Sequence, residues 1–244
     1  MEDEVPLSGG RITRGVVRVG DTVRRPATPS SPFVAELLDH LQQQGFAGAP
    51  RHLGYDPAGR DMLSYLPGWV PARFQRWSDP QVAAAGTLLR ALHDATRGSR
   101  LAGRRPVVCH HDPGPNNTVF SDDDVPVAFI DFDTAAPGDP LEDLGYMAWT
   151  WCISSKPAAP PAGAQAAQVR ILADAYRLDA ASRSCLVEAI LERQTRNAQW
   201  WRSHLTQPRP RVADDQQITE RIRWSEREYA HTAANREVFE AALR

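Results

Sequence analysis

The stretch VVCHHDPGPNNTVF (107–120) places residues suited to three kinds of chemistry side by side. Cys109 and the two histidines after it could hold a metal ion, or the thiol could act as a nucleophile with a histidine as its base. Asp112 and Asn117 carry hard oxygen atoms, which suit a general base or a ligand of Mg²⁺. The residue types alone leave a metal nest, a cysteine nucleophile and a catalytic loop open.

The position of these residues in a strand argues against the first two alternatives. If 107–110 forms a strand, successive side chains point to opposite faces, so the adjacent histidines do not converge on one ion. No second pair of soft ligands lies at zinc spacing. Cys109 follows two valines, a setting typical of buried packing. The catalytic loop is therefore the interpretation that we retain.

A second acidic segment, FIDFD (129–133), lies further along the chain. The short apolar runs NTVF and VAFI are joined by SDDDVP, a pattern typical of a hairpin. Asp131 follows the second run directly. We therefore expect the hairpin to fold Asn117 back toward Asp131.

Three motifs in order resemble the catalytic core of the protein-kinase-like phosphotransferases, in particular the aminoglycoside phosphotransferase and choline kinase branch. HHDPGPNN (110–117) resembles a loop of His-Gly-Asp with Asn five residues after the aspartate, and FIDFD resembles the Ile-Asp-Trp or Ile-Asp-Phe metal strand. GDPLEDLGY (138–146) resembles the Gly-Asp-Pro-x-x-Asp-Leu segment of that branch. Such an ordered set is more specific than any single motif.

The resemblance implies an α+β, two-lobed protein-kinase-like fold with a small antiparallel-sheet N-terminal lobe and a larger, mainly helical C-terminal lobe. It also implies transfer of the γ-phosphate of ATP to a hydroxyl of a small molecule, a reaction that needs alignment and charge neutralisation. Asp112 would be the base, while Asn117 and Asp131 would hold Mg²⁺. The resemblance assigns His110 to scaffolding, whereas His111 stands where relatives have glycine or arginine and receives no role.

The nucleotide side departs from the kinase pattern, because Lys156 is the only lysine in the chain. TVRRP (22–26) occupies the place of the usual lysine strand, and it resembles the Val-Leu-Arg-x-Pro strand of some members. We expect Arg24 to bind the phosphates, with Arg25 as the second choice, since alternation sends the two side chains to opposite faces. Glu36, on the following helix, is expected to brace the arginine.

Two further segments complete the expected nucleotide site. The glycines that could cover phosphates are Gly9, Gly10 and Gly15. By resemblance, LSYLP (63–67) is the inter-lobe linker, and its backbone at Ser64 and Leu66 would bind adenine.

The elements expected to carry the nucleotide side are strands with one helix. Strands are predicted within 7–26 around a Gly-Asp turn, and within 52–68 around a Pro-Ala-Gly-Arg turn. Between them, the pattern predicts a helix with Ser31 as its N-cap and Gly45 as its stop. We expect these elements to form a nucleotide-binding lobe over residues 1–66.

The elements expected to carry the catalytic side are mainly helices. A capping box at Ser78 begins a helix that ends at Gly98, and the pattern after Pro140 is helical to the end. Asp139 and Asp143 are expected to cap and brace these elements, and Asp133 is left without a role. We expect a catalytic and substrate-binding lobe over residues 67–244.

Composition excludes several classes of function. A formal net charge of -2 with both signs mixed gives no basic footprint for nucleic acid or an anionic membrane. No run of about 18 apolar residues occurs, and three cysteines are too few for a disulfide framework. We expect a cytoplasmic enzyme whose partner is a small-molecule alcohol. An aminoglycoside or other antibiotic, a sugar and an amino alcohol all fit as the acceptor, and the oligomeric state is unassigned.

Two other functions stay open at this point. A nucleotide-binding pseudokinase is motivated by the missing lysine and by the sparse glycines of the first strands. A metal-dependent hydrolase using the same histidines and aspartates is a more distant alternative.

Overall fold

The computed structural model describes residues 3–7, 15–71, 75–206 and 213–244, and it divides into two compact units. Unit 1 consists of Met1–Phe74 and Thr87–Pro140, and unit 2 consists of Gln75–Gly86 and Leu141–Arg244. This division assigns the middle of the chain to the same unit as the N-terminal sheet. The lobe boundary expected between residues 66 and 67 stays a prediction. Gly9 and Gly10 lie outside the described residues.

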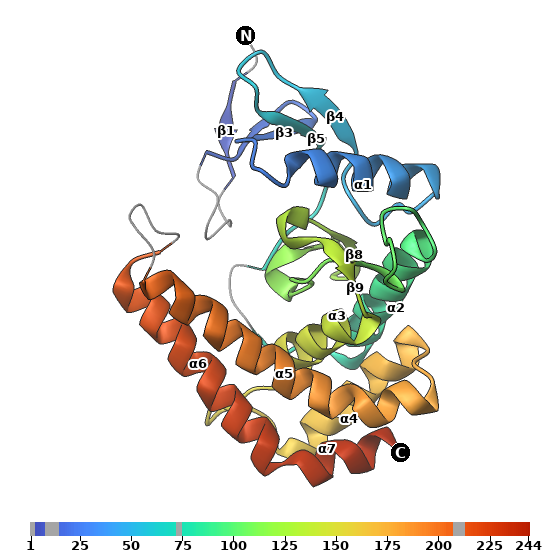
Figure 1. Ribbon diagram of the computed structural model, residues 1–244, viewed down its shortest axis with the longest axis vertical. Coiled ribbons are helices and arrows are strands. Elements are labelled where there is room, and N and C mark those ends of the chain that lie inside the picture. The colour runs from blue at the N-terminus through green and yellow to red at the C-terminus, as the bar shows by residue number, and fades with distance from the viewer. Residues whose placement is uncertain (1–2, 8–14, 72–74, 207–212) are drawn as a thin grey trace. The chain divides into compact units, whose positions relative to one another are not determined.

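The elements of the N-terminal half are short strands and two helices. They are β1 (Val5–Pro6), β2 (Val17–Val19), β3 (Thr22–Arg25), α1 (Ser31–Gln43), β4 (His52–Tyr55), β5 (Asp61–Ser64) and α2 (Asp79–Thr96). The strands form one antiparallel sheet in the order β1-β2-β3-β5-β4, and α1 packs beside β4 (Figure 1). The predicted Gly-Asp turn joins β2 to β3, where Gly20 has a φ of 55° that a residue with a Cβ rarely adopts.

Helix α1 begins one residue earlier than its sequence pattern predicts. The N-cap is Ser30, and Ser31 is a buried residue of the first turn. Its apolar face buries Leu37, Leu38 and Leu41, and the helix ends before Gly45, as expected. Because Ser31 is not the cap, its hydroxyl is available for a contact with the sheet.

Two antiparallel pairs and short helical turns follow in unit 1. They are β6 (Val107–Cys109), η1 (Pro115–Asn117), β7 (Thr118–Phe120), β8 (Pro126–Phe129), η2 (Phe132–Thr134) and β9 (Ala136–Gly138). The predicted hairpin is present as β7 paired with β8, and β6 pairs with β9. These pairs bring the two acidic segments of the sequence together.

The segment after β5 is tied to this hairpin. Trp69 donates its N–H to Phe120 O at 2.9 Å and accepts the Phe120 N–H at 2.8 Å, and the two rings stack. Gly68 has a φ of 128°, and a Cβ placed there would lie 2.1 Å from the Phe120 carbonyl oxygen. Only glycine allows this approach of the two backbones.

The rest of the chain is helical and belongs to unit 2. Its elements are α3 (Pro140–Met147), the π-helix η3 (Ala148–Cys152), α4 (Ala162–Tyr176), α5 (Ala180–Leu205), α6 (Asp215–Ala234) and α7 (Arg236–Leu243). Helices α5 and α6 lie side by side (Figure 1). Trp149 is buried and stacks on Trp224 with ring centroids 4.4 Å apart, so it packs the helices together.

An antiparallel sheet followed by a helical C-terminal half confirms the predicted α+β class. Among the described helices, none combines the length and the apolar composition needed to cross a bilayer.

Candidate active site

The loop after β6 holds Asp112 and Asn117 against each other. Asn117 Nδ2 donates to the Asp112 carboxylate at 2.7 Å and to the Asp112 carbonyl at 3.0 Å. Asn117 is 6% exposed, and its Oδ1 accepts from Asn116 Nδ2 at 3.1 Å. Pro113 and Pro115 restrict the backbone between them, so the spacing of the two polar side chains is set by a stiff loop.

A backbone hydrogen bond brings the second acidic segment to this loop. Ile130 donates its N–H to the Asn117 carbonyl at 2.9 Å, and Asp131 is the next residue. Asp131 has left-handed backbone angles, φ 63° and ψ 62°, a conformation that costs about 1–3 kcal/mol for a residue other than glycine. Such strain concentrates at functional sites.

His110 connects the same two segments from within the core. Its Nε2 donates to the Ile130 carbonyl at 3.0 Å, and its Nδ1 accepts the Asp112 N–H at 3.3 Å. These roles require a neutral ring with its proton on Nε2. The ring is fully buried against Phe129 and Phe132, as a scaffolding residue should be.

His111 also ties the segments, through a different contact. Its Nδ1 donates to the Thr134 carbonyl at 3.1 Å, while Thr134 Oγ1 donates to the His110 carbonyl at 2.9 Å. His111 has a φ of 64°, a backbone conformation that glycine adopts without cost.

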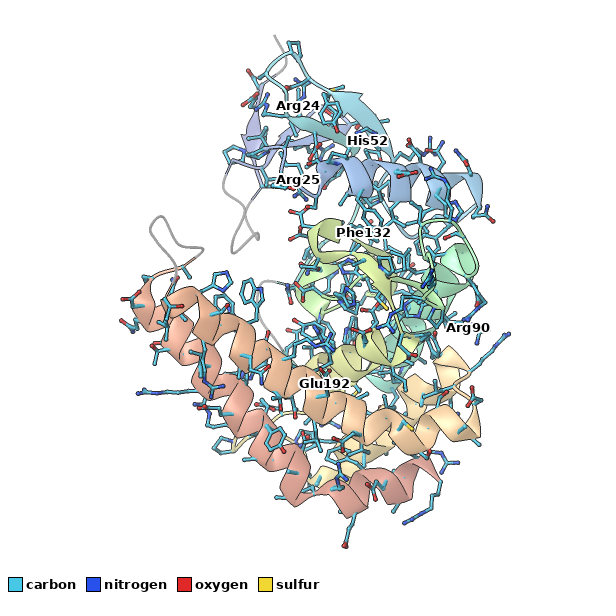
Figure 2. All side chains as sticks on the ribbon, viewed as in Figure 1. Arg24, Arg25, His52, Arg90, Phe132 and Glu192 are labelled. Atoms are coloured by element: carbon cyan, nitrogen blue, oxygen red, sulfur yellow. The ribbon has the colours of Figure 1, made fainter. Side chains whose placement is uncertain are left out.

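Arg25 is the arginine of β3 that reaches the acidic segment. It is 7% exposed, its Nη1 lies 3.4 Å from Asp131 Oδ1, and its Nη2 pairs with Asp133. On the other side, its Nε lies 3.9 Å from Asp61 Oδ2. Figure 2 shows Arg25 on the side of β3 toward Phe132. We call Arg25, Asp61, Asp131 and Asp133 the acidic cluster, since one cation faces three carboxylates.

Arg24 joins a different group of charges. Its Nη1 lies 3.8 Å from Asp56 Oδ2, and Arg60 pairs with both Asp56 and Glu4 at 2.7 Å. We call these four residues the balanced cluster, since two cations face two carboxylates. The structure therefore brings Arg25, not the first choice Arg24, to the predicted metal residue.

The pKa of Asp131 is raised above its ordinary value. Burial of the carboxyl is the main cause, and the neighbouring charge of Asp133 adds to it, while Arg25 opposes the shift. The Asp131 side chain nevertheless keeps 43% of its surface exposed, so a ligand can reach it. Carboxylate oxygens are hard donors, so the neighbouring Asp131 and Asp133 fit a cation such as Mg²⁺.

The other predicted nucleotide residues are found in different settings. Glu36 pairs with Arg100, and among the described residues it forms no ion pair with Arg24 or Arg25. Ser64 uses its backbone N–H and its hydroxyl to bind the backbone of Arg51. Within the described residues, neither backbone group of Leu66 makes a hydrogen bond, so both are available to a ligand.

Two residues of this site were missed from the sequence. Asp61 pairs directly opposite Arg25 across β3 and β5, and Ser31 Oγ donates to Asp61 Oδ2 at 2.6 Å. The only sequence signal for them would have been the pairing of β3 with β5. These strands are not consecutive in the chain, so no turn motif marks their register.

The chain matches a protein-family model. The model described as the phosphotransferase enzyme family matches residues 56–181, a range that contains the whole catalytic loop and the acidic segment. A curated relative, the trifolitoxin immunity protein of Rhizobium leguminosarum bv. trifolii, is 32% identical over 78% of this chain and 80% of its own length.

Two solved structures show the same fold at lower identity. A choline/ethanolamine kinase family protein from Mesorhizobium loti has a TM-score of 0.65 and 21% identity, covering 99% of this chain and 92% of its own. An aminoglycoside phosphotransferase from Streptomyces rimosus, in complex with ADP and streptomycin, has a TM-score of 0.52 and 18% identity, covering 72% and 86%. The predicted branch and the kinase-like fold are thereby confirmed.

Proposed function

Because this chain belongs to the phosphotransferase enzyme family, we propose that it transfers the γ-phosphate of MgATP to a hydroxyl group of a small molecule. The observation that carries the proposal is the hydrogen-bonded set around Asn117. Its side chain binds Asp112, and its backbone carbonyl binds the strand residue before Asp131.

Asp112 is the base in this proposal. It orients the acceptor hydroxyl and takes its proton as the new oxygen–phosphorus bond forms. The bond between the γ-phosphorus and the bridging oxygen breaks, and ADP leaves with the electron pair. Asn117 holds the Asp112 carboxylate in a fixed orientation, which limits the motion of the base during transfer.

Asn117 and Asp131 are the residues that would hold Mg²⁺. When bound, the metal neutralises the charge of the phosphates. The donor set supports this assignment, since a cation relieves the crowding of Asp131 and Asp133. Arg25 binds the phosphates in place of the usual lysine, and its guanidinium offers two parallel N–H donors to phosphate oxygens.

Adenine would bind the backbone of the segment after β5. The backbone groups of Leu66 support this role, as no other described residue bonds them. Ser64 contributes less than expected, since its N–H already bonds Arg51. We further propose a cytoplasmic location for the enzyme, where it would meet ATP.

Sugars, amino alcohols and antibiotics all carry a suitable hydroxyl, and we favour an antibiotic or toxin hydroxyl as the acceptor. The relative with 32% identity is named for immunity to trifolitoxin, and a structure of the same fold contains streptomycin. Transfer of a phosphate to such a molecule would protect the cell that makes or meets it.

A screen of ATP consumption over hydroxyl-bearing antibiotics, sugars and amino alcohols tests the proposal. We expect one acceptor class to stimulate consumption and phosphorus NMR of its product to show a phosphate monoester. Asp112→Asn is the control, because loss of a positioned base lowers turnover by about 10²- to 10⁴-fold while nucleotide binding stays.

Nucleotide binding without consumption above the Asp112→Asn level, across the whole panel, would instead favour the pseudokinase. The pseudokinase hypothesis rested on the missing lysine, and the position of Arg25 in the acidic cluster weakens it. Stoichiometric zinc or iron in the purified protein would favour the metal-dependent hydrolase.

A further inference from the structure

We propose that Asp61 positions Arg25 for the nucleotide phosphates, in the role expected of Glu36; this inference rests on the proposed function. In protein kinases the phosphate-binding cation is braced by a helix glutamate. In this chain the brace comes from the adjacent strand, and helix α1 acts through its first turn instead.

The register of the sheet puts the two residues together. Asp61 is the first residue of β5 and lies directly opposite Arg25 on β3. Both residues are buried, with 6% of Asp61 and 7% of Arg25 exposed. Asp61 Oδ2 lies 3.9 Å from Arg25 Nε. The attraction between a buried carboxylate and a buried guanidinium is screened much less than the attraction in a surface ion pair.

Helix α1 fixes the carboxylate of Asp61 from the other side. Ser31 Oγ donates to Asp61 Oδ2 at 2.6 Å and accepts the Thr28 N–H at 2.9 Å. This short chain of bonds links the start of α1 to β5. The helix therefore influences Arg25 through Ser31, although its glutamate points to Arg100.

The pair has binding capacity that the described residues do not use. Neither Asp61 Oδ1 nor Arg25 Nε makes a hydrogen bond within the described part of the chain. Asp56, a buried aspartate in the turn between β4 and β5, instead accepts bonds from the Ala58 and Arg60 backbone and from Arg60 Nε. The bonds of Asp56 hold its own turn, whereas the cation that pairs with Asp61 in the described part of the chain is Arg25.

Charge explains why Arg25 needs a carboxylate of its own. Its terminal nitrogens pair with Asp131 and Asp133, and the proposed function assigns Asp131 to the metal. Asp61 lies on the Nε side of the guanidinium, away from the nitrogens that pair with Asp131 and Asp133. It can therefore hold the guanidinium in place while the terminal nitrogens bind phosphate oxygens.

The test compares the binding of MgATP and of adenosine by calorimetry in full-length variants. Asp61→Asn should weaken MgATP about tenfold and leave adenosine unchanged, because it removes the charge that holds Arg25. Asp61→Glu should restore part of the affinity. The matched control is Asp56→Asn, which changes a buried aspartate in the turn before β5 and should leave MgATP affinity as in the wild type.

The double variant Arg25→Ala with Asp61→Asn separates positioning from a structural role. If Asp61 acts through Arg25, the double variant binds MgATP no more weakly than Arg25→Ala alone. An equal loss in both backgrounds, or a loss for adenosine, would overturn the inference. Ser31→Ala is the milder variant should Asp61→Asn not fold, and it should weaken MgATP a few-fold; unchanged MgATP affinity would contradict the inference.

The two proposals fail in different ways. If Arg25→Ala weakens MgATP and Asp61→Asn does not, the positioning role is wrong and the phosphotransferase proposal stands. If the wild-type protein does not bind MgATP at all, the proposed function itself is wrong.

Discussion

Arg24 and Arg25 are neighbours on β3, yet the charges around them are arranged for different purposes. The balanced cluster matches two cations with two carboxylates and closes the turn between β4 and β5. The acidic cluster sets one buried arginine against three carboxylates from two segments of the chain. A negative excess in a partly buried site favours the binding of a further cation, so the second cluster is suited to a ligand.

The pKa directions follow the same contrast. Hydrogen bonds from Arg60 hold the pKa of Asp56 and of Glu4 below their ordinary values, so these carboxylates stabilise the folded chain. Burial and the charge of Asp133 raise the pKa of Asp131, so its ionised form costs stability. The balanced cluster stabilises the fold, whereas the acidic cluster holds a carboxylate whose ionised form costs stability.

Asp131→Asn should have the largest effect on binding. We expect Mg²⁺-dependent ADP affinity to fall by about 100-fold or more, since a metal supplies several kcal/mol of charge stabilisation. The melting temperature at pH 7 should rise, because the costly charge is gone. Calorimetry and thermal unfolding measure both changes, and a lower melting temperature would contradict the contrast between the clusters.

The rise in melting temperature should depend on pH in a defined direction. A raised pKa in the folded state means that the ionised carboxylate costs stability above that pKa. The cost vanishes as the pH falls below the unfolded value of about 3.9. The wild type and Asp131→Asn should therefore approach equal melting temperatures in acid.

Arg25→Ala should weaken MgATP by about 10- to 100-fold, because hydrogen bonds to charged groups contribute about 1.5–3 kcal/mol. Arg24→Ala, its matched control one residue away, should change MgATP affinity little. Equilibrium binding of both variants decides between the two arginines. The reverse order of effects would restore Arg24 as the phosphate-binding residue.

Asp56→Asn should change stability and leave nucleotide binding alone. Because the pKa of Asp56 is lowered in the folded state, its contribution is present above the unfolded value and is lost as the pH falls through the folded value. The variant should melt below the wild type at pH 7, and the difference should shrink below about pH 4. A difference that persists in acid would mean that packing, not charge, is lost.

Asp133→Asn should have the smallest effect. It removes the charge that raises the pKa of Asp131 but leaves burial, the larger cause, in place. Mg²⁺ binding should therefore extend to slightly lower pH, with little change at pH 7. Metal titrations at pH 5 and pH 7 would show this, and weaker binding at pH 7 would identify Asp133 as a metal ligand.

The sequence predicted the hairpin that brings the loop of Asn117 to the segment of Asp131, because local signals define it. The hairpin between β7 and β8 has its own turn residues, and it brings Asn117 to the strand before Asp131. The nucleotide side depends on strand pairing, which no turn specifies. Alternation along β3 sends Arg24 and Arg25 to opposite faces of the sheet. Both faces are partly apolar, because Val17 lies opposite Arg24 and Val23 lies two residues before Arg25.

Helix α1 shows the same limit at the level of a single residue. Its apolar positions and its glycine stop were visible in the sequence, and the structure confirms them. Its cap was placed one residue too late, because Ser30 and Ser31 are equally good by type. The contact of Ser31 with Asp61 decides between them, and that contact joins residues 30 positions apart.

The close approach of Gly68 to Phe120 couples the motion of the segment after β5 to the motion of β7. The segment that carries Leu66 cannot swing without moving β7, because the Trp69 bonds clamp it to the strand that continues from Asn117. If adenine binds at Leu66 as proposed, we expect its binding to shift the orientation of β7. Any side chain at position 68 would push the two backbones apart and remove this coupling.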